Sequence, residues 1–115
     1  MTLDFFESYS SNLKGVTSDI KWENNLCFMV KEKIFLLVSL DDRPHGAAIK
    51  VSKEDFYELT NRDGITQAPH FAKEQWIKVT DPRSLTKKEW EVYIKKSYDL
   101  VAEKLPAKIR KELGK

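Results

Sequence analysis

Few side chains in this sequence could take part in catalysis, and they are scattered. Its two histidines, His45 and His70, are far apart, and its single cysteine, Cys27, stands between apolar residues. A catalytic triad needs a nucleophile beside a base, and structural zinc needs four clustered Cys or His ligands. The four glycines are isolated, so no phosphate-binding loop is present. The sequence therefore predicts a protein that is not an enzyme and that uses no metal ion or cofactor.

Aromatic side chains beside lysines are the remaining candidates for binding chemistry. Trp76 is flanked by Lys73 and Lys78, and His70 closely precedes it. Proteins that bind single strands stack bases on aromatic rings beside basic residues, and three side chains could do this: Trp22, Trp76 and Trp90. Trp76 could instead belong to a sheet core, and His70 could fix its loop by hydrogen bonds. An enzyme would be indicated if His70, Lys73 and a carboxylate met in a concave pocket.

Positive charge is placed unevenly along the chain. The net charge of the 115 residues is only +2. Residues 1–85 hold 11 Lys or Arg against 13 Asp or Glu, whereas residues 86–115 hold 9 against 5. The C-terminal segment is therefore mildly basic, which is typical of a solvated helix face and also of surfaces that attract anions.

Hydrophobic periodicity predicts the elements that must position these residues. In the first half, apolar residues recur at helical spacing over 3–14, and the β-rich runs 26–30 and 34–40 predict a hairpin. Turn-forming residues at 41–46 precede a third predicted strand at 47–51. Three successive strands indicate an antiparallel meander.

The second half combines short elements with one long helix. A short helix is predicted from Ser52 to Thr60, an irregular or extended segment over 65–72, and a strand over 76–80. Thr86 with Glu89 forms a capping box that opens a long amphipathic helix, and a short terminal helix follows it. The order predicts a single α+β domain, residues 1–115, with two layers: a mainly antiparallel sheet covered on one face by helices.

The location is predicted from what the sequence lacks. The first residues carry acids where a secretory signal needs basic residues, and the longest apolar run, 34–38, is far shorter than the roughly 20 residues of a membrane span. A lone cysteine fits a reducing compartment. We expect a cytoplasmic monomer without a membrane partner.

Two segments resemble the paired signature of the MmcQ/YjbR family. In 69–79 a His and a Lys precede Trp76, and 97–106 reads Ser-Tyr-Asp-Leu-Val-Ala-Glu-Lys-Leu-Pro. The resemblance extends over nearly the whole chain, and it implies a fold similar to that of frataxin and CyaY. Frataxin binds iron along an acidic first helix, but the first helix here offers only Asp4 and Glu7, so iron is not expected.

The same resemblance implies DNA binding, because members are commonly described as DNA-binding proteins with a double-wing motif. The two wings would be the hairpin loops 31–33 and 41–46, and the second wing places two acids beside its arginine. Cations on strands and loops could converge on one side of the sheet. The expected DNA-binding residues are Lys31, Lys33, Arg43, Lys50, His70, Lys73, Trp76 and Lys78.

A second interpretation keeps the fold and changes the partner. An adaptor or chaperone-like module would bind another protein through an exposed sheet face and would have no nucleic-acid activity. An exposed apolar patch, rather than a basic one, would favour it.

Overall fold

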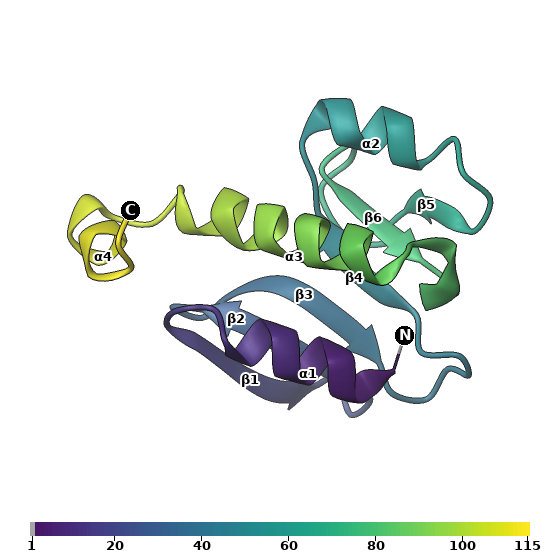
Figure 1. The fold of residues 1–115 in the computed structure, drawn as a ribbon, viewed down its shortest axis with the longest axis horizontal. Helices are drawn as coiled ribbons and strands as arrows, with labels where there is room; N and C mark the ends of the chain where they lie inside the picture. The colour runs from purple at the N-terminus through teal and green to yellow at the C-terminus, as the bar shows by residue number, and fades with distance from the viewer. Residues whose placement is uncertain (1) are drawn as a thin grey trace.

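The elements follow one another as predicted in outline, with two further strands (Figure 1). The computed structural model describes residues 2–115. The helices are α1 (Leu3–Ser11), α2 (Lys53–Leu59), the 3-10 helix η1 (Pro82–Ser84), α3 (Lys87–Ala102) and α4 (Ala107–Glu112). The strands are β1 (Val16–Lys21), β2 (Asn25–Val30), β3 (Lys33–Ser39), β4 (Ala47–Lys50), β5 (Ile65–Gln67) and β6 (Trp76–Val79).

The six strands form one sheet in the order β1-β2-β3-β4-β6-β5, and all neighbours are antiparallel. Helix α3 runs along the middle of the sheet, and α1 covers its β1 side (Figure 1). The predicted α+β class, with helices on one face, is confirmed. We call the opposite face, on which no helix of residues 2–115 lies, the open face.

The first turns of α1, α2 and α3 are capped by side chains that accept hydrogen bonds from backbone N–H groups. Thr2 Oγ1 accepts from the backbone N–H of Phe5 at the start of α1, and Ser52 does the same for Asp55 at the start of α2. Thr86 and Glu89 form the predicted capping box of α3. Such caps each contribute about 1 kcal/mol.

The core lies between the helices and the sheet, and large aromatic side chains fill it. Phe6 of α1 meets Trp90 of α3 edge to face, with ring centroids 5.0 Å apart. Trp90 is fully buried, and its indole N–H donates to the carbonyl of Pro82 at 2.7 Å. This bond satisfies the polar edge of the ring, so the apolar stripe of α3 can be wholly buried.

The sheet is interrupted between β3 and β4, and helix α3 bridges the interruption. The β2–β3 register shifts so that Phe35 is an extra, bulged residue, and β3 pairs with β4 only at three positions, beginning at Leu36. Beyond them Ser97 Oγ of α3 donates to the carbonyl of Phe35 at 2.6 Å and accepts from the N–H of Lys50 at 2.9 Å. One hydroxyl therefore joins the helix layer to two strands.

The terminal helix packs on the turn between α1 and β1. Gly15 in that turn has φ +77°, and a Cβ placed there would lie 2.7 Å from Leu113 Cδ2. Tyr98 Oη also donates to the carbonyl of Lys14 at 2.5 Å. A side chain at position 15 would therefore adopt a strained backbone conformation and would have to shift the end of the Leu113 side chain.

Three features differ from the predicted elements. Strand β1 was not expected, although it forms an edge of the sheet, and β5 lies in a segment expected to be irregular or extended. Helix α1 ends at Ser11, three residues before the predicted position 14. No helix within residues 2–115 is long and apolar enough to cross a membrane.

Candidate functional site

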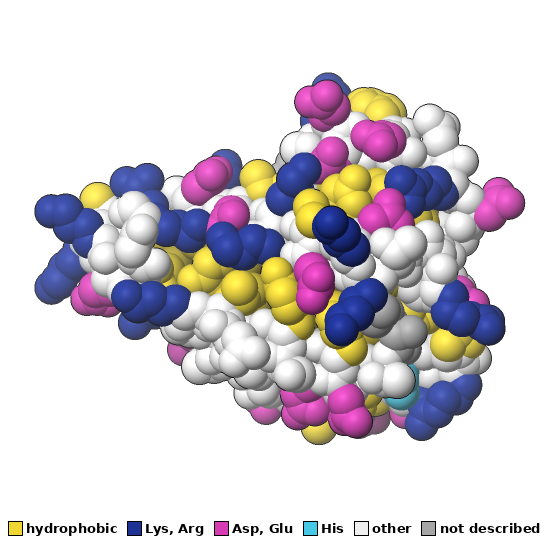
Figure 2. Space-filling model, in the orientation of Figure 1, with side chains coloured by type: hydrophobic (Ala, Val, Ile, Leu, Met, Phe, Trp, Pro, Cys, Tyr) yellow, Lys and Arg dark blue, Asp and Glu magenta, His cyan; other side chains and the backbone are white. Residues whose placement is uncertain are grey.

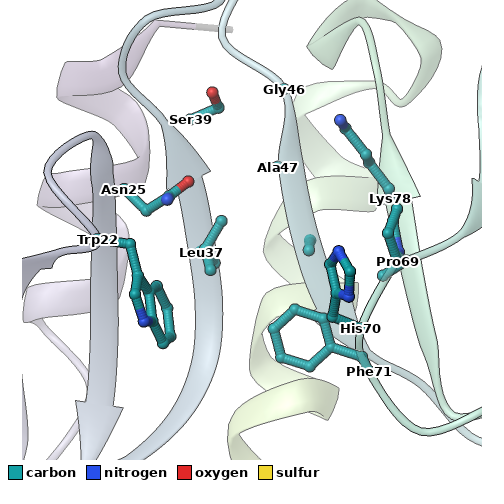
Figure 3. A pocket seen from close by; sticks show the side chains of 12 residues that line it. Trp22, Asn25, Leu37, Ser39, Gly46, Ala47, Pro69, His70, Phe71 and Lys78 are labelled. Atoms are coloured by element: carbon teal, nitrogen blue, oxygen red, sulfur yellow. The ribbon is translucent and has the colours of Figure 1, made fainter.

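A groove of about 620 Å³ crosses the open face of the sheet (Figure 3). Trp22 stands on one side and His70 with Phe71 on the other, and Leu37 lies between them (Figure 3). The volume is within the range of about 300–1,000 Å³ typical of ligand sites. The residues that line it are Trp22, Asn25, Leu37, Ser39, Gly46, Ala47, Ala48, Ala68, Pro69, His70, Phe71 and Lys78.

A small residue makes the floor of this groove hollow. Ala48 pairs across the sheet with Leu37 on one side and with Lys78 on the other. Because cross-strand partners project from the same face of a sheet, the methyl group of Ala48 lies between two longer side chains. The ammonium of Lys78 is the only full positive charge among the lining residues, and no carboxylate is among them.

The loop before β6 forms one wall, and an amide side chain holds it in place. Gln67 donates through Nε2 to the carbonyl of Ala68 at 2.9 Å and accepts through Oε1 from the N–H of Glu74 at 2.9 Å. Phe71 stacks on Trp76 with centroids 4.3 Å apart and planes 26° apart. The loop that carries His70 is therefore fixed at both ends before any ligand arrives.

Trp22 forms the opposite wall and is 64% exposed, more than any other large hydrophobic side chain in residues 2–115. Its φ is +52°, and the next residue, Glu23, also has a positive φ of +68°. Asn24 ties this turn to the following loop, since its carbonyl accepts from the N–H of Leu40 and its amide donates to Asp41. Only one feature of the sequence indicates this wall, a tryptophan between the charged residues Lys21 and Glu23, and the strand before it was not predicted.

Of the expected site residues, His70 and Lys78 line the groove. His70 has φ +69°, so the groove is flanked by two bulky residues in left-handed conformations. Such conformations cost free energy and cluster at functional sites. Trp76 is 8% exposed and lies behind Phe71, so it supports the wall without forming its surface.

The other expected residues lie outside the groove. Arg43 turns its guanidinium to its own loop, donating to the carbonyls of Leu40 and Asp42. Lys73 is exposed but is not among the lining residues. Lys50 is half-buried; burial, and then the charge of Lys104, lower its pKa.

Lys31 and Lys33 lie in and beside the β2–β3 turn, near α4 rather than near the groove. The ammonium of Lys31 is 4.0 Å from the Glu112 carboxylate of α4. Of the expected residues, His70 and Lys78 thus line the groove, Lys31 lies beside α4, and Arg43 and Lys73 belong to neither surface. The structure does not bring all of their cations to one side of the sheet.

Around α4 positive charge is concentrated, as the left end of Figure 2 shows. We call this surface the cationic end. Three segments supply it: the α1–β1 turn, the β2–β3 turn and the chain from the end of α3 onward. Its seven cations, against four acids at positions 32, 99, 103 and 112, are Lys14, Lys31, Lys104, Lys108, Arg110, Lys111 and Lys115.

A shallow hollow of about 480 Å³ lies within the cationic end and is lined by Glu103, Ala107, Arg110, Lys111 and Lys115. Lys115 and Lys95 both pair with Asp99. Across residues 2–115 no ion pair involves Lys108, Arg110 or Lys111, so these three charges are available to an anionic ligand.

Neither surface assembles the groups of a metal centre. Within residues 2–115 no three His, Cys, Asp or Glu side chains lie close enough together to hold a metal ion. Cys27 is fully buried, and burial raises the pKa of its thiol. The combination of His70, Lys73 and a carboxylate that would indicate an enzyme is not present in the groove.

Comparison with known proteins identifies similar chains. The family model described as YjbR matches residues 11–100. The crystal structure of a Deinococcus radiodurans protein with the domain DUF419 is 26% identical, covers 98% of this chain and 88% of its own, and superposes with a TM-score of 0.89. A Pseudomonas syringae protein, a structural genomics target, is 24% identical with a TM-score of 0.70 over 88% of this chain and 99% of its own, which shows the shared fold. No curated protein matches this sequence.

Proposed function

The chain belongs to the YjbR family, and from this membership together with its concentrated positive charge we propose that it binds DNA through the cationic end. The observation that carries the proposal is the meeting of cations from three separate segments around α4. Lys and Arg side chains that neutralise phosphates release condensed counterions, and this release supplies most non-specific affinity for DNA. A modest net charge is sufficient when the excess lies at one end.

One of the two expected wings supports this proposal. The turn containing Lys31 lies beside α4, so a phosphate backbone that follows α4 also meets this turn. The second wing, 41–46, offers less to phosphate, because its arginine bonds to its own loop and two acids precede it. We therefore propose contact through the first wing and α4.

The test removes three unpaired charges from α4. The variant Lys108→Gln/Arg110→Gln/Lys111→Gln should bind a labelled random-sequence duplex more weakly than the wild type between about 50 and 200 mM salt. If each side chain neutralises one phosphate, the slope of log affinity against log salt should become shallower by up to about 2.7. Fluorescence anisotropy measures both quantities.

The matched control removes the same charge elsewhere. Lys53, Lys87 and Lys88 are exposed at the starts of α2 and α3, away from α4. Lys53→Gln/Lys87→Gln/Lys88→Gln changes the net charge equally and should leave the slope close to that of the wild type. Equal losses in the two variants would mean that overall charge, not the cationic end, governs binding. No duplex binding by the wild type at about 50 mM salt would remove the proposal.

A protein partner is the second candidate, and the edge strand β1 favours it. β1 pairs with a neighbour on one side only, four of its six residues are exposed, and Ile20 is 56% exposed. An unprotected edge can accept a strand from another protein. This adaptor function predicts a defined partner that binds the wild type and not Ile20→Lys, measured with purified proteins by calorimetry.

A further inference from the structure

The groove on the open face presents an aromatic side chain that solvent would normally disfavour. Trp22 is 64% exposed and is held with φ +52° by the turn that Asn24 anchors. The other two tryptophans, Trp76 and Trp90, are buried. A large ring kept exposed by a strained backbone offers a face on which a planar ligand can stack.

The opposite wall is organised in advance. Gln67 fixes the loop, Phe71 rests on Trp76, and exposed His70 faces the groove with φ +69° (Figure 3). Binding to a preformed wall avoids the entropic cost of ordering a loop. A ligand that enters the groove therefore meets aromatic rings on both sides.

Charge limits the class of ligand. Lys78 is the only fully charged residue among those that line the groove, and no Asp or Glu is among them. The lining thus combines aromatic and small apolar side chains with one ammonium, which complements a planar ring joined to an anionic group. Nucleotides have this composition, and aromatic rings beside lysines bind single strands without regard to sequence.

We propose that the groove binds an unpaired base of a single-stranded nucleic acid, stacked on Trp22, with the adjoining phosphate near Lys78. The proposal rests on the nucleic-acid binding proposed above, but it assigns the base to a surface separate from the cationic end. Bases in a duplex are paired and stacked, so their faces cannot enter the groove. The protein should therefore distinguish single strands from duplexes through this groove.

Two substitutions test the groove in different ways. Trp22→Ala removes the stacking ring from an exposed turn, and Ala48→Phe fills the floor between Leu37 and Lys78. Stacking on one aromatic side chain is worth about five- to 150-fold in affinity. Anisotropy with a labelled oligothymidine should show a loss in this range for both variants, while the affinity for a duplex of equal length stays unchanged.

Val92→Ala is the control, because Val92 is an exposed hydrophobic residue of α3 and does not line the groove. It should change neither affinity. If Trp22→Ala bound the single strand as tightly as the wild type does, the groove proposal would be overturned, even if Ala48→Phe failed to fold. Duplex binding that depends on the cationic end would then leave the DNA proposal intact. A wild type that binds neither nucleic acid would overturn both.

Discussion

Two buried serines differ in whether their hydroxyl groups form hydrogen bonds. Ser97 and Ser10 are both fully buried on helices. Ser97 Oγ bonds to backbone groups of β3 and β4, whereas no partner within residues 2–115 bonds to Ser10 Oγ. A buried polar group left without a partner costs about 1–3 kcal/mol. The two positions therefore differ in what truncation to alanine leaves behind.

We expect Ser97→Ala to lower the free energy of unfolding by about 1–3 kcal/mol, because it leaves the carbonyl of Phe35 and the N–H of Lys50 unsatisfied. Ser10→Ala should leave it unchanged or raise it by up to about 1 kcal/mol, because it removes an unpaired hydroxyl. Urea denaturation of both variants measures these changes. Equal destabilisation would show that the bridge between β3 and β4 contributes nothing.

At the site, single residues could be predicted from sequence only where spacing was informative. His70 and Lys78 were selected because they flank a tryptophan, and both line the groove. Sequence indicates Trp22 only as one of three tryptophans that could stack bases and not as an expected site residue, because its place in the groove depends on the strand before it and on a turn with two positive φ values. A positive φ cannot be predicted from sequence unless a glycine or an asparagine occupies the position.

Among the elements, the β2–β3 turn is built from unfavourable residues. Lys31 and Glu32 have φ of +47° and +67°, and they connect strands that pair at Val30 and Lys33. Two-residue hairpin turns with positive φ at both positions favour Asn and Gly. Left-handed conformation costs about 1–2 kcal/mol per residue for a side chain with a Cβ.

Glu32→Gly should raise the free energy of unfolding by roughly 0.5–1 kcal/mol, since the relief of this strain exceeds the entropic cost of glycine in the unfolded chain. Lys33→Gly is the adjacent control. It lies in β3, where glycine should lower stability by about 0.5–1 kcal/mol. Thermal unfolding of the two variants measures both changes in the free energy of unfolding. Destabilisation by Glu32→Gly would show that the left-handed conformation at this position is not strained.

Elements buried on one side were predictable, and the edge strand was not. Helix α3 and the β2–β3 hairpin carry apolar runs or stripes that only burial explains. β1 reads Val-Thr-Ser-Asp-Ile-Lys, and both its faces are largely exposed. Because neither face of β1 is buried, its sequence lacks the alternation of apolar and polar residues that indicates a half-buried strand.

On the scale of the whole molecule, size limits how much DNA one copy can contact. The longest dimension of the molecule is 40 Å. Duplex DNA rises about 3.4 Å per base pair, so about 12 base pairs is the most that one copy can contact, and the cationic end at one end of the long axis contacts no more than that. The basic C-terminal segment, which supplies five of the seven cations of the cationic end, was evident from sequence. The approach of Lys14 and Lys31 to it could not be predicted, because the two turns that carry them are far from α4 in the chain.

The salt dependence of duplex binding should therefore grow with duplex length only up to about 12 base pairs. Anisotropy titrations with duplexes of about 6, 12 and 24 base pairs, each at several salt concentrations, measure the slope per bound protein. We expect a shallower slope for the shortest duplex and equal slopes for the two longer ones. A slope that continues to rise beyond 12 base pairs would indicate that several copies bind as one unit.

The contact between Gly15 and Leu113 makes substitutions at two positions that are distant in sequence depend on each other. A side chain at position 15 would collide with Leu113 at 2.7 Å and would also have to adopt φ +77°. A side chain at position 15 would have to shift the end of the Leu113 side chain, which directly follows α4, and α4 carries Lys108, Arg110 and Lys111 of the cationic end. A substitution at position 15 therefore also affects Leu113, so this packing contact between two segments of the cationic end limits how freely the binding surface can evolve.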